Sequence, residues 1–112
     1  MAKLEAMLAG EFEQILGDLE AVIMQSISAT LEDSSDFIIE DARCAVRVYE
    51  RYSAFGGNRL SMTIVLMQKG ETMHFSAITS GGSNAVFFKM DTVGESAFLD
   101  RIRDVVVRYR VR

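Results

Sequence analysis

The feature that most constrains the fold is a strand-like pattern that runs, with two interruptions, from residue 43 to residue 79: side-chain types alternate in its first and last parts, and its middle part is apolar on both sides. The interruptions, at 56–58 and 69–70, contain glycine and asparagine, which accept the positive φ angles of hairpin turns at little cost. Alternation with a period of two is typical of β-strands, and short turns join antiparallel neighbours. The pattern therefore predicts three consecutive antiparallel strands, over 43–54, 59–68 and 71–79.

The same alternation predicts which side of each strand faces the core. In the first strand we expect the core side to carry Cys44, Val46, Val48, Tyr52 and Ala54. The opposite side carries Arg43, Arg47, Tyr49, Arg51 and Ser53. The strand over 59–68 is apolar on both sides, which favours a central place in the sheet.

The amino-terminal segment has two solutions. Apolar residues keep helical spacing through the first 27 residues, but Gly10 interrupts them and two glutamates follow it. Acidic residues are favoured in the first turn of a helix, so a helix can begin after this glycine. One solution is a single helix over 2–28. The other, which we prefer, is a strand over 3–9 followed by a helix over 11–25.

Between this helix and residue 43 the pattern is weaker. Residues 27–31 alternate and predict a strand with one wet face, and the segment LEDSSDF at 31–37 then breaks the pattern with turn residues. The acidic residues of this region do not follow a calcium-loop pattern, and we interpret them as a solvated turn. They are Asp33, Asp36, Glu40 and Asp41.

The carboxy-terminal part predicts a second helix. Thr92 and Glu95 have capping-box spacing, and apolar residues follow at helical intervals as far as Tyr109. Before them, residues 85–88 are short, apolar and aromatic, which suits a last strand or a buried connection. The final VRYRVR also alternates, so an extended tail is the other solution there.

These elements predict an α+β fold in one domain over 1–112, with the order β-α, four or five antiparallel strands, then α. A sheet with an apolar face must cover that face, and we expect the two amphipathic helices to pack on it together. The element order is similar to the helix-grip order of lipid- and hormone-binding START-like domains, which curl a sheet around a helix. This chain is short for that arrangement, so any cavity would be small.

Composition excludes several classes of protein. No apolar stretch approaches the roughly 18 residues of a membrane-spanning helix, and no signal peptide is visible, so we expect no membrane span. One cysteine, Cys44, excludes an internal disulfide and suits the cytoplasm. The net charge of −4 argues against nucleic acid as a partner. Ten acids fall in residues 1–41 and eleven bases in 42–112, so the two parts can attract each other within one molecule or between two.

The chain offers little material for catalysis or metal binding. His74 is the only histidine, and we expect it to be an exposed strand residue rather than a catalytic base. We expect Cys44 to be an inert, small apolar side chain. One histidine and one cysteine 30 residues apart do not make a zinc site, and phosphate-loop and dinucleotide motifs are absent. We therefore expect neither a metal nor a cofactor.

Two polar features remain as ligand or interface candidates. Arg43, Arg47 and Arg51 share a strand face, where i and i+4 positions lie roughly 13 Å apart, so the row would line a groove or pair with neighbouring acids rather than bind one small anion. The second feature is the turn TSGGSN, whose backbone N–H groups can form an anion-binding nest or simply turn the chain. The candidate residues of this turn are Ser80, Gly81, Gly82, Ser83 and Asn84.

Several short sequence motifs resemble those of a family of small bacterial proteins known as a domain of unknown function: VYERYS, GGNR, SAITSGGS and FFK. The resemblance is strongest over about residues 30–100. It implies a one-domain cytosolic protein with a strand before its first helix. It brings no activity, cofactor or catalytic residue with it.

We expect a non-enzymatic binding or interaction module, which takes a small apolar or anionic ligand or a protein partner and forms a homodimer. The alternative is a small enzyme-like pocket domain that uses Tyr49, Arg51, His74 and Ser80 around a cavity. A closed pocket lined by these four side chains would favour the enzyme, whereas their dispersal over the surface would count against it.

Overall fold

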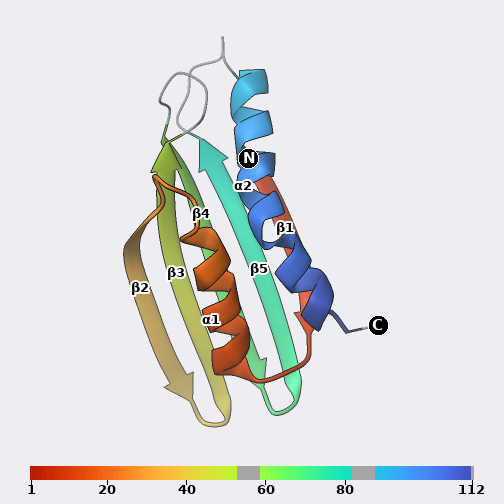
Figure 1. Cartoon of the computed structure of the whole chain (residues 1–112). Coiled ribbons are helices and arrows are strands. Elements are labelled where there is room, and N and C mark those ends of the chain that lie inside the picture. The colour runs from red at the N-terminus through yellow and green to blue at the C-terminus, as the bar shows by residue number, and fades with distance from the viewer. Residues whose placement is uncertain (53–58, 82–87, 112) are drawn as a thin grey trace.

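The computed structural model describes residues 1–52, 59–81 and 88–111, and it confirms the α+β class. Within the described residues, one strand and one helix are followed by four strands and then by a second helix at the carboxy-terminal end, in the order expected (Figure 1). The elements are β1 (Ala2–Leu8), α1 (Phe12–Ile23), β2 (Thr30–Ile39), β3 (Ala42–Tyr52), β4 (Arg59–Lys69), β5 (Thr72–Gly81) and α2 (Phe88–Tyr109).

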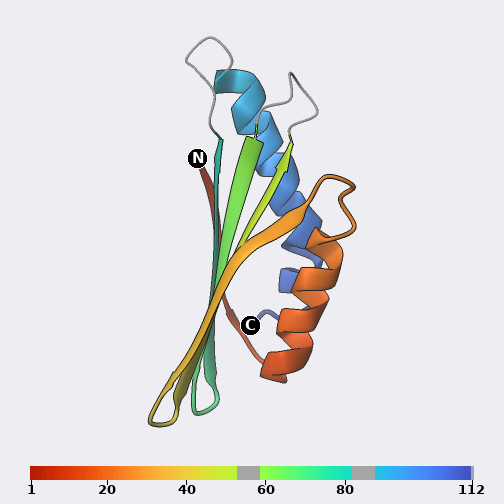
Figure 2. The same cartoon turned by 90° about the vertical axis from the view of Figure 1, so that its left-hand side faces the viewer.

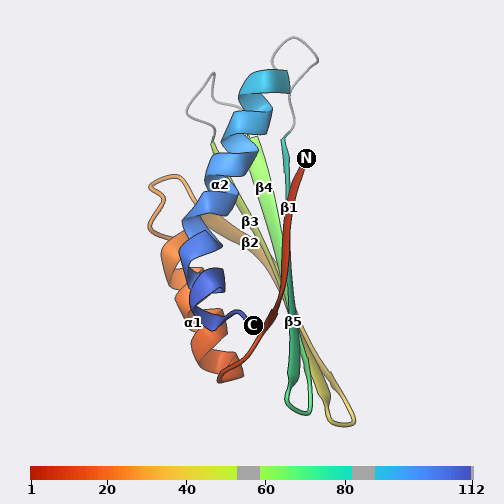
Figure 3. The ribbon, with the colours of Figure 1, turned by 90° about the vertical axis from the view of Figure 1, so that its right-hand side faces the viewer.

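The five strands form one antiparallel sheet in the order β1-β5-β4-β3-β2. β4 is the central strand, as its apolar faces predict. Both helices lie on the same face of the sheet, and in the two edge-on views no helix or strand of the described residues lies against the other face (Figures 2 and 3). The first strand returns beside the last, but the sheet is not closed into a barrel.

The strand-then-helix solution for the amino terminus is confirmed. Gly10 has a φ of +146°, a value that L side chains rarely adopt, and it turns the chain between β1 and α1. The carboxylate of Glu11 accepts a hydrogen bond from the Gln14 N–H at 2.6 Å and so caps α1. The change of backbone conformation at Gly10 and the helix cap at Glu11 therefore exclude a continuous helix through this segment.

The prediction that LEDSSDF forms a turn is wrong, because these residues lie within β2. β2 is an edge strand with all ten residues exposed, so neither face needs an apolar side chain. A register shift between Leu31 and Asp33 further disturbs the alternation. The turn comes later, at residues 40–41, where Glu40 has a φ of +54°.

The prediction for the faces of β3 is also wrong, because the two faces are exchanged. Ala45 and Tyr49 are fully buried beneath the helices, on the same side as the arginines. The side with Cys44, Val46 and Val48 faces away from the helices. The physical reason is that α1 and β2 supply acids to the arginines, so these side chains lie within the layered structure at low cost.

The second helix begins earlier than its capping-box pattern predicts. α2 starts at Phe88, so Thr92 lies within the helix, and Phe88 belongs to no strand. The alternative of an extended tail applies only after Tyr109, where Arg110 bridges to Leu8 of β1. The predicted turn at 56–58 and the connection at 85–87 lie outside the described residues.

The core fills the space between the sheet and the helices. α2 packs over β5 and β1, and α1 lies beside α2 over β3 (Figure 1). The largest fully buried side chains come from both helix and sheet: Leu8, Ile15, Leu19, Ile23, Tyr49, Leu60, Met62, Ile64, Leu66, Met73 and Phe75. The two helices are also joined through Asp18, which accepts a hydrogen bond from the Tyr109 hydroxyl at 2.5 Å.

Candidate functional site

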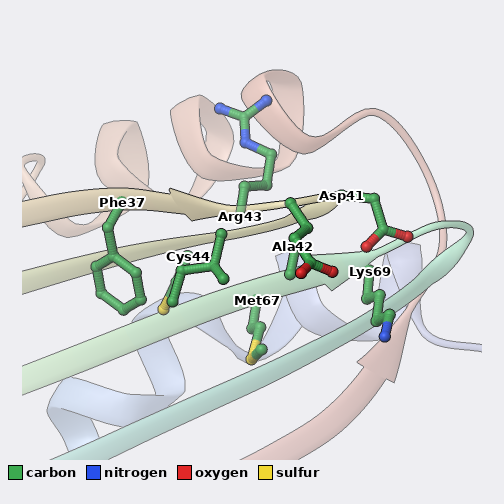
Figure 4. Close-up of a pocket in the computed structure, with 9 residues that line it drawn as sticks. Phe37, Asp41, Ala42, Arg43, Cys44, Met67 and Lys69 are labelled. Atoms are coloured by element: carbon green, nitrogen blue, oxygen red, sulfur yellow. The ribbon is translucent and has the colours of Figure 1, made fainter.

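The arginine row of β3 lies on the side that the helices cover. Figure 4 shows Arg43 pointing toward α1, whereas Cys44 and Met67 lie on the other side of the sheet. Within this row the Arg47 side chain is largely buried, at 12% exposed, whereas the Arg43 side chain is 39% exposed. The acids that reach the row belong to α1 and β2, so the attraction between the acidic and basic parts of the chain acts within one molecule.

Arg47 and Tyr49 form a polar cluster with two acids beneath α1. Arg47 Nη1 lies 3.0 Å from Asp36 Oδ1, and Arg47 Nε lies 3.6 Å from Glu20 Oε2. The Tyr49 hydroxyl donates to the same Glu20 oxygen at 2.9 Å. Burial, and then the hydrogen bond to Glu20, raise the pKa of Tyr49, so the hydroxyl remains a donor at neutral pH. This cluster fixes α1 on the sheet.

Arg43 is neutralised in the same way at the other end of α1. It forms an ion pair with Glu13, and its guanidinium carbon lies 3.9 Å from the centre of the Phe12 ring. Arg43 and Arg47 thus pair with acids of the first helix as well as of a neighbouring strand. Both arginine charges are therefore compensated by acids of the chain.

Arg51 differs from the other two arginines of the row. It is partly buried near the end of β3 and lines a hollow together with Arg101 of α2. Burial, and then the nearby positive charge of Arg101, lower the pKa of Arg51. Two cations therefore lie beside one hollow on the helix side of the molecule.

The residues of the enzyme alternative do not converge. Tyr49 and Arg51 lie on the helix side of β3, whereas His74 and Ser80 lie on the opposite face of the sheet. His74 and Ser80 are six residues apart on β5, which corresponds to about 20 Å. The His74 ring nitrogen Nδ1 contacts Met7 Sδ at 3.3 Å, and the Ser80 hydroxyl lies 2.8 Å from that of Ser61. No nucleophile and base meet among these four.

The glycine turn after β5 falls largely outside the described residues. Ser80 and Gly81 are the last two residues of β5 and continue its pairing with β4. Gly82, Ser83 and Asn84 lie beyond the described part of the strand. An anion nest at this turn remains a prediction.

A further candidate surface, which the sequence pattern did not indicate, is the face of the sheet that no described residue covers. We call it the open face. Its middle is apolar, and its members lie opposite one another across the strands. In the order β2, β3, β4, β5, β1, the rows are Phe37, Cys44, Met67, His74, Met7; then Ser35, Val46, Val65, Ser76, Glu5; then Asp33, Val48, Thr63, Ile78, Lys3. The sequence pattern assigns three of these residues, Cys44, Val46 and Val48, to the core, and for this reason it does not indicate an exposed apolar face.

A hollow of about 250 Å³ opens at one end of the open face, beside the β2–β3 hairpin (Figure 4). Phe37, Cys44 and Met67 contribute its apolar lining. Burial, and then the negative charge of Asp36, raise the pKa of the Cys44 thiol. The thiol stays protonated and behaves as a small apolar group, as expected from the sequence, so the hollow extends the apolar surface rather than adding chemistry to it.

The described residues show no metal centre. Within residues 1–52, 59–81 and 88–111, three or more histidine, cysteine, aspartate or glutamate side chains do not gather in a way that could hold an ion. In the same ranges, neither helix has the length and apolarity required to cross a membrane.

Fold and surface together define a class of protein: a small α+β protein with a two-helix layer on one face of an antiparallel sheet and an exposed, partly apolar sheet face on the other. The chain belongs to DUF6054, a family of unknown function whose model matches residues 1–110. This confirms the resemblance to a domain of unknown function. No curated protein matches the chain.

Proposed function

We propose that this protein is a non-enzymatic interaction module that associates with a second copy of itself through the open face. The observation that carries the proposal is the apolar middle of a sheet face left uncovered by both helices. On this face Met7, Phe37 and Met67 share the first row and are 43–48% exposed, and Ile78 in the third row is 42% exposed. Contiguous apolar surface of this kind is uncommon on monomers and is typical of interaction sites.

The open face has the size that a specific dimer requires. Strands of 10–11 residues make up most of it. At about 3.3 Å per residue and about 4.8 Å per strand, five strands outline an area of about 800 Å². Covering that area on both copies buries about 1,600 Å², which is the standard size of a stable protein–protein interface.

The open face is also complementary to itself. A two-fold axis parallel to the central strand places β4 on β4, β3 on β5 and β2 on β1 of the second copy. Within the third row this arrangement sets Asp33 opposite Lys3 and Val48 opposite Ile78. Opposite charges then meet at the rim and apolar side chains meet inside, which is the usual anatomy of an interface.

Sedimentation velocity over roughly 1–100 μM tests the proposal, because interfaces of this size reach micromolar affinity or better. Met67→Lys adds a charge on β4, the central strand of the open face, where the side chain is 46% exposed in one copy. We expect at least about a 100-fold loss of dimer affinity, because an unpaired charge becomes buried on association. Val107→Lys is the matched control, since Val107 is 62% exposed on the helix layer.

A wild-type protein that stays monomeric throughout this range would overturn the proposal. A dimer that survives Met67→Lys and is lost with Val107→Lys would overturn it as well, by placing the contact on the helices. A charge swap tests the axis: Asp33→Lys and Lys3→Asp should each weaken the dimer, and the double variant should recover most of the affinity.

Cys44 is the single cysteine, and its thiol is free, which supports the reducing cytoplasm as the compartment we propose. No observation favours the enzyme alternative, since its residues lie on opposite faces of the sheet. A different protein as the partner of the open face is the outcome that a monomeric wild-type protein would support.

A further inference from the structure

β2 forms one edge of the sheet, and its outer side carries backbone groups that no described strand pairs. The sheet order places β3 on one side of β2 and no described strand on the other (Figure 1). From Asp33 to Ile39, β2 keeps an uninterrupted register with β3. In such an antiparallel pair, every second residue directs its N–H and C=O away from the partner strand. A long, regular edge of this kind is a template for a further strand.

The opposite edge of the sheet, at β1, is partly covered by the chain itself. The Met7 carbonyl oxygen accepts the Val111 N–H at 2.9 Å, and the Ala9 N–H donates to the Tyr109 carbonyl oxygen at 2.9 Å. Natural edge strands are protected by such covering segments, or by lysine and proline within the strand. β2 contains neither lysine nor proline, and no described segment covers its outer side. Of the two edges, β2 is therefore the one that can accept another strand.

The charge of this edge determines which strand it can accept. β2 and the turn after it contain no basic residue and five acids, namely Glu32, Asp33, Asp36, Glu40 and Asp41. Among these acids only Asp36 forms an ion pair with a described residue, Arg47. Pairing of β2 with β2 of a second copy would set acids beside acids, and like charges on neighbouring strands are destabilising. The edge therefore favours a basic strand from another protein over a second copy of this chain.

Apolar side chains at the end of β2 add a second element of recognition. Ile38 and Ile39 are 73% and 66% exposed and, as consecutive residues of a strand, point to opposite faces of the sheet. On the helix side, a hollow of about 440 Å³ opens beside Ile38 and Asp36. When a strand adds to a sheet edge, main-chain hydrogen bonds give affinity and such hollows accept alternate side chains. A segment that alternates basic and apolar residues fits these features.

We propose that the outer edge of β2 binds an extended, basic segment of a partner protein, which joins the sheet as an additional strand. Lysine or arginine side chains of the segment lie near Glu32 and Glu40, and an apolar side chain packs on Ile38. The site is independent of the self-association proposed above. The added strand lies beside β2 in the plane of the sheet, whereas a second copy covers the open face.

An NMR titration of the full-length, ¹⁵N-labelled protein tests the site with an acetylated, amidated peptide of alternating lysine and valine, as long as residues 32–40. We expect saturable shifts of the β2 amide signals and slower hydrogen exchange at every second residue of 33–39, because pairing protects the outward amides. Two control peptides separate the contributions. One has glutamate in place of lysine, and the other keeps the side chains but has methylated backbone nitrogens. Neither should bind measurably at concentrations up to about 1 mM.

Protein variants test the role of charge at about 0.15 M ionic strength, where exposed charges are screened beyond about 8 Å. Glu32→Gln combined with Glu40→Gln should weaken binding of the lysine–valine peptide about fivefold, because two exposed ion pairs are lost. Glu71→Gln combined with Asp104→Asn is the matched control. It changes the net charge equally at two exposed acids outside β2 and its turn, and it should change the affinity less than about twofold.

Four results would overturn the proposal. Equal binding of the methylated peptide would mean that charges attract the peptide without strand pairing, and equal binding of the glutamate peptide would mean that basic character is not recognised. The third is slower exchange in β1 in place of β2, or no saturable binding at all. The fourth is loss of peptide binding in Met67→Lys, which would place the peptide on the open face, since the edge of β2 does not include Met67.

Discussion

Removing one hydroxyl, in Tyr49→Phe, tests the orientation of β3 that the structure establishes. The ring of Tyr49 is fully buried and stays in place in the variant, so only the hydrogen bond to Glu20 at 2.9 Å is lost. A hydrogen bond to a charged group contributes about 1.5–3 kcal/mol. The Glu20 side chain is 32% exposed and keeps Arg47 at 3.6 Å, so we expect the lower part of that range, about 1.5–2 kcal/mol.

Urea denaturation followed by circular dichroism measures this change as a lower midpoint with an unchanged m-value. In a thermal scan each kcal/mol of this loss lowers the Tm by about 4–8 °C. Tyr52→Phe is the matched control three residues later on the same strand. Its side chain is 57% exposed and its hydroxyl bonds to no described residue, so the change should stay within about 0.5 kcal/mol. Equal effects of the two substitutions, or a larger one at Tyr52, would refute the assigned orientation of β3.

Two further predictions concern the same protein in the same assay. Gly10→Ala should cost about 1–3 kcal/mol, because the φ of +146° is strained for alanine and the new Cβ would lie 3.1 Å from Ile15 Cδ1; a midpoint equal to the wild-type value would show that the backbone relaxes freely. The raised pKa of Tyr49 stabilises the fold in full below the unfolded-state value of about 10, and this contribution is lost as the pH rises above it. The stability difference between the wild type and Tyr49→Phe should therefore shrink in alkaline solution, and a constant difference would contradict the assigned cause.

The sequence was sufficient to predict the elements whose pattern matches one local rule. The glycine turns delimited β4 and β5, alternation predicted β5 as a strand, and the apolar character of both sides of β4 placed it at the centre. Gly10 correctly separated β1 from α1, because the chain needs an unusual φ there. The resemblance to the family was recognised from short sequence motifs, and these motifs lie within the residues that the family model matches.

The sequence could not predict elements whose character depends on distant partners. β2 lies at an edge with both faces in water, so its polar residues give no alternating signal. In β3, the sequence pattern must assign one face to the core. The apolar Val46 and Val48 favoured their own face, whereas the buried face carries Ala45 and Tyr49. The decisive fact is the ion pairing of Arg47 with acids 11 and 27 residues away, Asp36 and Glu20, which no local pattern shows.

The candidate sites show the same contrast between features that a local pattern predicts and features that depend on distant residues. The sequence identified Arg51 as a site residue but not Arg101, which lies 50 positions further along the chain and comes close only because α2 packs over the sheet. The sequence did not predict the open face, because its valines and methionines are residue types that are typical of a core. Exposure, which separates an interface from a core, is a property of the assembled layers and not of the residues.

The central claim is that two copies of the chain meet through the open face, and an isotope-filtered NOE experiment tests it most directly. In a mixture of ¹³C-labelled and unlabelled protein, only protons of different copies give filtered signals. We predict intermolecular NOEs from the methyl groups of Val65, Met67 and Ile78 on the open face. Intermolecular NOEs confined to the helix layer, such as those from Val107, or none at concentrations where sedimentation shows a dimer, would contradict the claim.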